Sequence, residues 1–167
     1  MFTPELIERA AALIAACRAR GLKIATAESC TGGLVAGLLT EIPGSSAVLE
    51  RGFVVYSNQA KHELLDVPAS TLADFGAVSE QTARALAQGA IIHSRADFAV
   101  AITGIAGPDG GTAEKPVGLV HFACADRRGA VIAVEKRYGA LSRGAIRLAS
   151  IATAMDLLEE AATRVAG

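Results

Sequence analysis

Segments typical of strands and of helices alternate along this chain of 167 residues, and the alternation restricts the possible folds more than any other feature. Short β-branched and apolar runs are separated by longer segments with helical spacing of apolar residues. The pattern predicts helices over residues 4–20, 34–42, 58–67, 80–95 and 143–165, and strands over residues 22–28, 47–57, 97–103, 117–125 and 130–138. The expected fold class is α/β, a three-layer α/β/α single domain over residues 1–167.

The sheet is expected to be mixed and partly parallel. Residues 97–103, "DFAVAIT", are apolar nearly throughout, as in parallel strands that are covered on both faces. The last two strands flank the turn "DRRG", which predicts an antiparallel hairpin. Because 51% of the residues are hydrophobic and only 4% are aromatic, the core must consist mainly of Ala, Val, Ile and Leu.

Composition excludes several classes of function. The net charge of −1, from 16 basic and 17 acidic residues, gives no nucleic-acid footprint. The amphipathic N-terminus lacks the pattern of a signal peptide, and no uncharged apolar stretch is long enough to span a bilayer. Three cysteines, Cys17, Cys30 and Cys124, lack the spacing of a disulfide framework or a zinc site. We expect a cytoplasmic protein without membrane or nucleic-acid partners.

The motif "ESCTGG", residues 28–33, joins a predicted strand to a predicted helix. Ser29, Cys30 and Thr31 lie at this turn, and their backbone N–H groups would point out of the helix N-terminus, where a developing oxyanion is stabilised. The motif is therefore a candidate nucleophile site. Two alternatives remain: Ser29 or Thr31 caps the helix, and Cys30 is an ordinary core residue.

A second motif, "YSNQAK", carries Tyr56 at a strand end and Lys61 near a helix start. The field at a helix N-terminus, together with burial, would lower the pKa of Lys61 and make the neutral amine accessible. A neutral lysine can act as the general base for a serine. The alternative is an exposed lysine on a solvated face.

The long loop "GIAGPDGGTAEKP" follows the strand 97–103. Loops of this length in a compact domain are usually functional or mobile. Thr103, Gly104 and Gly107 begin it, and although it matches neither a P-loop nor a Rossmann fingerprint, it could wrap a phosphate, a ribose or a planar ring.

Basic and imidazole side chains are the remaining candidates. Arg143 and Arg147 lie four residues apart on the last predicted helix, where they could hold a phosphate or form a surface pair. The three histidines show no metal-ligand spacing, so we expect no metal and no cofactor.

Taken together, "TAESCTGGL", "GSSAVLERGFVVYSNQAK", "GAVSEQTA" and "ITGIAGPDGGTAEKPVGLV" closely resemble the C-terminal domain of the competence/damage-inducible protein CinA, in the same order and over nearly the whole chain. That family includes stand-alone nicotinamide-nucleotide amidohydrolases. Many relatives carry a separate N-terminal nucleotide-pyrophosphatase domain, and we do not expect that activity from these residues.

The resemblance implies hydrolysis of the carboxamide of nicotinamide mononucleotide to nicotinate mononucleotide and ammonia, in pyridine-nucleotide recycling and without a metal. It places the family's catalytic serine, lysine and tyrosine on Ser29, Lys61 and Tyr56. The family's Thr-Gly-Ile-Ala-Gly loop falls on residues 103–107. Substrate contacts are expected from the residues of these turns, namely Cys30, Thr31, Gly32, Thr103, Gly104 and Gly107. By analogy with the family we also expect a homo-oligomer.

Two other hypotheses stay open at this point. Cys30 would be the nucleophile if the helix terminus activated its thiol. Alternatively, the domain would be a non-catalytic module that binds a nucleotide or a protein partner through the same loops.

Overall fold

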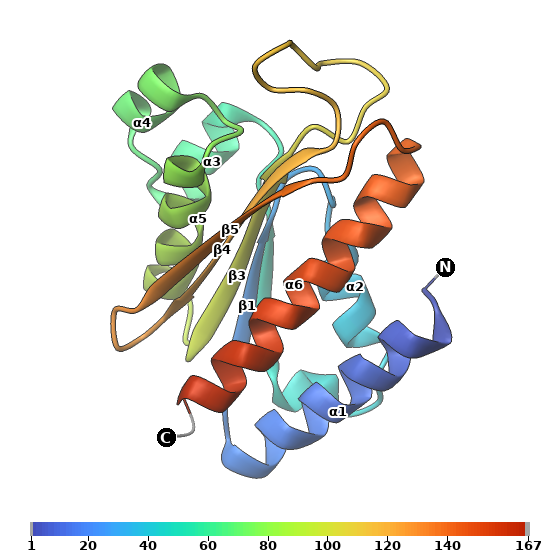
Figure 1. Cartoon of the computed structure of the whole chain (residues 1–167). Coiled ribbons are helices and arrows are strands. Elements are labelled where there is room, and N and C mark those ends of the chain that lie inside the picture. The colour runs from blue at the N-terminus through green and yellow to red at the C-terminus, as the bar shows by residue number, and fades with distance from the viewer. Residues whose placement is uncertain (1, 166–167) are drawn as a thin grey trace.

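The computed structural model describes residues 2–165, which form a five-stranded sheet between two layers of helices (Figure 1). The elements in chain order are α1 (Pro4–Arg20), β1 (Ile24–Glu28), α2 (Leu34–Thr40), the 3₁₀ helix η1 (Ser45–Ala47), β2 (Leu49–Val54), α3 (Asn58–Leu65), α4 (Ala69–Phe75), α5 (Glu80–Ile92), β3 (Phe98–Gly104), β4 (Leu119–Asp126), β5 (Val131–Arg137) and α6 (Arg143–Val165). The predicted three-layer α/β/α fold is confirmed.

The strand order is β2-β1-β3-β4-β5. Strand β1 pairs in parallel with both β2 and β3, whereas β3–β4 and β4–β5 are antiparallel pairs. The prediction of a mixed sheet that ends in an antiparallel hairpin is therefore confirmed.

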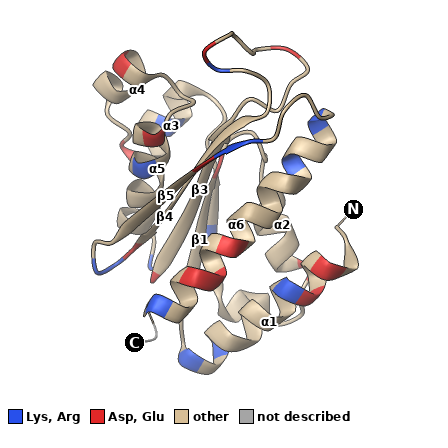
Figure 2. Ribbon diagram, viewed as in Figure 1, with Lys and Arg blue, Asp and Glu red and all other residues tan. Residues whose placement is uncertain are grey.

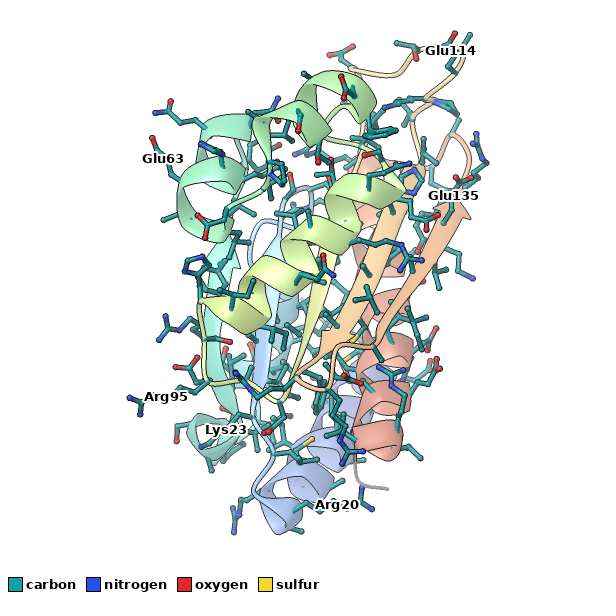
Figure 3. The ribbon with its side chains drawn as sticks, turned by 90° about the vertical axis from the view of Figure 1, so that its left-hand side faces the viewer. Arg20, Lys23, Glu63, Arg95, Glu114 and Glu135 are labelled. Carbon is teal, nitrogen blue, oxygen red and sulfur yellow. The ribbon has the colours of Figure 1, made fainter. Side chains whose placement is uncertain are left out.

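The connections on either side of β1 run over opposite faces of the sheet. Helix α2 joins β1 to β2 on the face that also carries α1 and α6, and α3, α4 and α5 join β2 to β3 on the other face (Figures 1 and 3). The chain thus leaves β1 for one neighbour on one face and reaches the other neighbour over the opposite face. In open α/β sheets, ligands bind at such a switch point, outside the carboxyl ends of the strands.

Alternation along the strands sends different side chains to the two faces. Bulky residues such as Ile24, Phe98 and Ile102 pack against α1, α2 and α6. Alanines occupy the other face, where they pack against α3 and α5: Ala25, Ala27, Ala99, Ala101, Ala123 and Ala125. The small side chains bring α5 close to the sheet, so the core is thick on one side and thin on the other.

Element ends differ modestly from the prediction. Strand β2 is shorter than residues 47–57 because η1 takes the residues before it, with the Val48 amide donating to the Ser45 carbonyl. Its pairing ends at Val54, although the Val55 amide still donates to the Glu28 carbonyl at 2.9 Å. No helix within residues 2–165 is long and apolar enough to cross a membrane.

Candidate active site

Ser29 and Lys61 meet at the carboxyl end of β1, although 32 residues separate them in the sequence. The Lys61 Nζ lies 3.2 Å from the Ser29 Oγ. It also donates to the backbone carbonyls of Val55 at 2.9 Å and Tyr56 at 3.1 Å. The structure therefore brings together the serine and the lysine that the two motifs carry.

Lys61 is deeply buried, with only 1% of its surface exposed, so the alternative of a solvated surface lysine is wrong. It is the fourth residue of α3, whose N-terminus is capped by Ser57 through a hydrogen bond from the Ala60 amide. Burial lowers the pKa of Lys61, because removal from water penalises the ammonium form. No carboxylate compensates this effect, since the amine contacts only a hydroxyl and two carbonyls among the described residues.

Helix α2 begins at Leu34, as predicted, but its cap is not one of the expected hydroxyl side chains. Gly33 at the cap position contributes no side-chain hydrogen bond. The alternative in which Ser29 or Thr31 caps the helix is therefore wrong. The cap is Glu28, whose buried carboxylate accepts from the amides of Gly33, Val35 and Ala36. Sequence analysis missed this role of Glu28. The usable signal is that Gly33, directly before the helix, has no side chain to cap it, while a carboxylate stands at the end of the preceding strand.

The amides expected to point out of the helix belong instead to the turn before it. The Gly32 amide donates to the Ser29 carbonyl at 3.0 Å. Among residues 2–165, the amides of Cys30 and Thr31 donate to no other residue. These two N–H groups are thus the donors that remain available in the turn that carries Ser29.

Cys30 and Thr31 are both buried. Burial raises the pKa of the Cys30 thiol to about 11, which favours the thiol over the thiolate and argues against Cys30 as the nucleophile. The Thr31 Oγ1 has no hydrogen-bond partner within the described chain. Neither side chain competes with Ser29 for Lys61.

Tyr56 reaches the site through its backbone and its side chain separately. Its carbonyl holds the Lys61 amine, while its largely exposed phenol points elsewhere and accepts from an Arg143 guanidinium nitrogen at 3.2 Å.

Helix α6 places its two arginines against the loops of the site. Arg143 also donates to the Gly107 carbonyl at 2.8 Å, and Arg147 donates to the Thr31 carbonyl at 3.1 Å. Figure 2 shows this basic start of α6 beside the loops at the upper end of the sheet. Neither guanidinium has an acidic partner among the described residues. The two arginines therefore connect the site loops and keep their charge uncompensated.

The residues of the long loop differ in their access to this site. Thr103 is buried, and its hydroxyl donates to the Ala77 carbonyl at 2.7 Å. This hydrogen bond holds the segment between α4 and α5 against the end of β3. A Cβ on Gly104 would lie 2.7 Å from Val120 Cγ2, which leaves no room for a side chain there. Gly107, at φ +73°, is the loop residue whose carbonyl accepts from Arg143. Gly32 lies near Arg147, since a Cβ on Gly32 would be 3.5 Å from its Nη2 atom.

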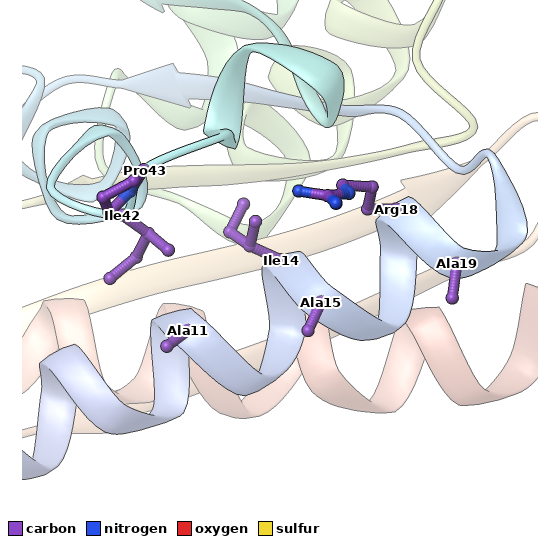
Figure 4. Close-up of a pocket in the computed structure, with 7 residues that line it drawn as sticks. All are labelled: Ala11, Ile14, Ala15, Arg18, Ala19, Ile42 and Pro43. Atoms are coloured by element: carbon purple, nitrogen blue, oxygen red, sulfur yellow. The ribbon is translucent and has the colours of Figure 1, made fainter.

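The site does not coincide with the hollow drawn in Figure 4. That hollow lies between α1 and the Ile42–Pro43 segment, near the amino ends of the parallel strands. Residues 2–165 contain no group of three or more His, Cys, Asp or Glu side chains placed to hold a metal ion. Candidate chemistry at the carboxyl end therefore rests on the serine, the lysine and the turn amides.

Comparison with known proteins identifies the family of the chain. Residues 7–162 match the family model of the CinA C-terminal domain. Nicotinamide-nucleotide amidohydrolase PncC of Escherichia coli K12 is 49% identical over 158 residues, which cover 95% of each chain. The protein of the same name from Enterobacter agglomerans is 53% identical over 134 residues, covering 80% of this chain and 81% of that protein.

A solved structure is equally similar. The crystal structure of the competence/damage inducible protein CihA from Agrobacterium tumefaciens superposes with a TM-score of 0.95 and 55% identity, covering 96% of this chain and 98% of that one. The chain belongs to the CinA C-terminal domain family, as its motifs predict.

Proposed function

We propose that this chain is an amidohydrolase that converts nicotinamide mononucleotide to nicotinate mononucleotide and ammonia, with Ser29 as the nucleophile and Lys61 as the general base. The observation that carries the proposal is the 3.2 Å contact between the Ser29 Oγ and the Nζ of a buried lysine. The enzyme class is that named for relatives about half identical over most of both chains.

Three oxygens surround the Lys61 Nζ, so the ammonium form can donate to all of them. The neutral amine that the reaction requires has two N–H groups and one lone pair. In that form the carbonyls of Val55 and Tyr56 accept the two N–H groups, and the lone pair is available for the Ser29 hydroxyl proton. The lowered pKa increases the fraction of lysine in this form near neutral pH.

In the first half of the reaction, the Ser29 Oγ attacks the carboxamide carbon while Lys61 takes the hydroxyl proton. The oxyanion that forms accepts hydrogen bonds from the amides of Cys30 and Thr31. The tetrahedral intermediate then collapses, the C–N bond breaks, and the Lys61 ammonium gives its proton to the departing NH₂ group. Ammonia leaves and a nicotinoyl ester of Ser29 remains.

In the second half, water attacks the ester carbon and gives a proton to Lys61. Collapse of this intermediate breaks the bond to Ser29, whose oxygen recovers the proton from Lys61, and forms the carboxylic acid. The acid gives its proton to solvent and leaves as the carboxylate, and serine and lysine are then in their starting protonation states. Tyr56 contributes through its carbonyl, which orients the lysine, and through its phenol, which orients Arg143.

The two arginines favour a nucleotide over free nicotinamide. A phosphate attracts guanidinium groups that have no acidic partner, and Arg143 and Arg147 are of this kind at the loops of the site. Gly32 and Gly107 have positive φ, which lets the backbone turn sharply in the two loops beside the site, whereas Gly104 is required by its close contact with Val120.

The test is ammonia release from nicotinamide mononucleotide in the presence of a chelator, for wild type beside Ser29→Ala and Cys30→Ala. We expect turnover by wild type, loss of at least about a thousandfold for Ser29→Ala, and retention of most activity by Cys30→Ala. The nucleotide product is identified by chromatography, with nicotinamide riboside and nicotinamide as comparison substrates.

Full activity of Ser29→Ala would refute the assignment of the nucleophile. Saturable binding of the nucleotide by folded wild type without turnover would instead identify a binding module.

A further inference from the structure

Glu28 is a buried carboxylate that the mechanism above does not use. It is the last residue of β1, has 0% exposure, and directly precedes Ser29. Its Oε2 accepts from the amides of Gly33 at 3.0 Å and Val35 at 3.1 Å, and its Oε1 accepts from the Ala36 amide at 2.9 Å. All three donors belong to the start of α2.

This arrangement differs from the other capped helices of the chain. Helices α1, α3 and α5 are capped by the hydroxyls of Thr3, Ser57 and Ser79, each directly before its helix. For α2 the cap comes from five residues upstream of Gly33, across the turn that carries the nucleophile. The carboxylate thereby closes residues 28–33 into a ring through its own side chain.

The backbone around Glu28 is fixed from both neighbouring strands. Its carbonyl accepts from the Val55 amide at 2.9 Å, beside β2, and the Ser29 amide donates to the Ile102 carbonyl of β3 at 3.0 Å. The backbone thus fixes where the turn begins, and the carboxylate fixes where it ends. Between these anchors, the amides of Cys30 and Thr31 are the ones within residues 28–33 that donate to no other described residue.

The charge of Glu28 is compatible with an oxyanion nearby. A buried carboxylate is stabilised by several amide donors and by the positive end of a helix dipole. The negative charge of Glu28 and the partial positive charge of the α2 N-terminus therefore offset one another. The amides of Cys30 and Thr31 are then the groups that would bind the oxyanion. The helix terminus does not compete for the oxyanion, because its amides are already occupied.

We propose that Glu28 is a positioning residue for the amide hydrolysis: by binding the first amides of α2 it holds the turn 29–33 so that the Ser29 hydroxyl stays at the Lys61 amine and the amides of Cys30 and Thr31 face the oxyanion. This inference rests on the proposed function. It requires the geometry of the carboxylate and not merely its charge.

Two substitutions separate geometry from charge. Glu28→Gln keeps the length but has one acceptor oxygen, and its NH₂ group faces an amide donor. Glu28→Asp keeps the charge, but its side chain is one methylene shorter, so its carboxylate no longer reaches the amides of Gly33, Val35 and Ala36 together. Thr3→Ala is the matched control, because it removes the side-chain cap of α1 and leaves the hydrogen bonds of residues 28–33 unchanged.

The experiment measures kcat and KM for nicotinamide mononucleotide, together with the rate at which a small fluorophosphonate labels Ser29. We expect both Glu28 variants to lose roughly 10- to 100-fold in kcat and in labelling rate, as small misplacements of reacting groups do, with KM changed by less than about twofold. Hydrogen exchange of residues 29–36 should become faster in both. The pH midpoint of activity should not move, since Glu28 does not contact Lys61, and Thr3→Ala should match wild type in kcat and labelling.

Several outcomes would overturn the proposal. Wild-type kcat and labelling in folded Glu28→Gln would show that the ring is dispensable. Normal activity of Glu28→Asp beside an impaired Glu28→Gln would assign the effect to charge. Failure of both variants to fold would assign Glu28 a purely structural role. If wild type does not hydrolyse the nucleotide, the proposed function fails, and the labelling rates still decide whether Glu28 positions Ser29.

Discussion

The two ends of the parallel strands place polar side chains in contrasting ways. At the carboxyl end Glu28, Ser29 and Lys61 are buried. The Glu28 carboxylate binds the first amides of α2, and the Lys61 amine contacts the Ser29 hydroxyl. At the amino end Lys23 and Asp97 are only partly buried and tie the chain together through backbone groups. Figure 3 labels Lys23 and Arg95 at this lower end, opposite Glu114 and Glu63.

The contrast shows where the molecule accepts an energetic cost. A lysine amine removed from water without a carboxylate partner is unfavourable for stability, and its persistence at one end of the sheet indicates a chemical task. At the amino end, the Asp97 carboxylate accepts from a backbone amide while it stays partly in contact with water, so it carries no comparable desolvation cost. Substitutions at the carboxyl end should therefore affect mainly activity, and substitutions at the amino end mainly stability.

Replacement of Lys61 by methionine is expected to have the largest effect. Methionine fills much of the lysine volume but has no amine, so Ser29 loses its base. We expect kcat for ammonia release to fall at least about a thousandfold, within the range for a lost general base. The matched variant Lys23→Met, at the amino end, should stay within about twofold of wild type. Equal losses in both variants would remove the contrast between the two ends.

The pH dependence of activity should report the lysine. Below its pKa, Lys61 carries a proton and cannot accept one from Ser29, so kcat/KM should fall about tenfold per pH unit on the acid side. Because burial lowers the pKa of Lys61 from 10.5, the midpoint of the free enzyme should lie below that value. The measurement is kcat/KM across pH in buffers of constant ionic strength. A profile that is flat across this acid limb would argue against a lysine base.

Much of the fold follows from local sequence patterns. The uniformly apolar segment 97–103 predicts the buried strand β3, and Thr3, Ser57 and Ser79 mark helix starts that the structure confirms as caps. Strand ends are less predictable, because β2 is limited by η1 and by its pairing with β1 rather than by its own β-branched residues.

The candidate site depends on contacts that no local pattern contains. The meeting of Ser29 with Lys61 and of Arg143 with Gly107 joins residues that are 32 and 36 positions apart. The resemblance to a known family pairs Ser29 with Lys61 beforehand, but it does not pair Arg143 with Gly107. The choice between a phosphate site and a surface pair for Arg143 and Arg147 stayed open for the same reason, since a helical spacing of four says nothing about what the helix faces.

Substitution of Arg143 by alanine should sharpen the comparison within the carboxyl end itself. If this guanidinium binds the phosphate, its loss removes a charged hydrogen bond, so kcat/KM for nicotinamide mononucleotide should fall roughly 10- to 100-fold. Nicotinamide riboside lacks the phosphate, and its kcat/KM should change much less. The two substrates are compared with the same variant preparation. Equal losses for both would mean that Arg143 acts by holding Tyr56 and Gly107 in place.

The smallest effect on activity is expected at the amino end, from Asp97→Ala. The Asp97 carboxylate accepts from the Lys23 amide at 2.7 Å, and the two backbones are also joined directly. Loss of a hydrogen bond to a charged group should lower the free energy of unfolding by about 1.5–3 kcal/mol. Urea unfolding measures this loss, and kcat should remain within about twofold of wild type because Asp97 lies at the far end of β3 from Thr103. A large fall in kcat with little loss of stability would show that the amino end also controls the position of Ser29, since β1 begins directly after Lys23 and ends directly before Ser29.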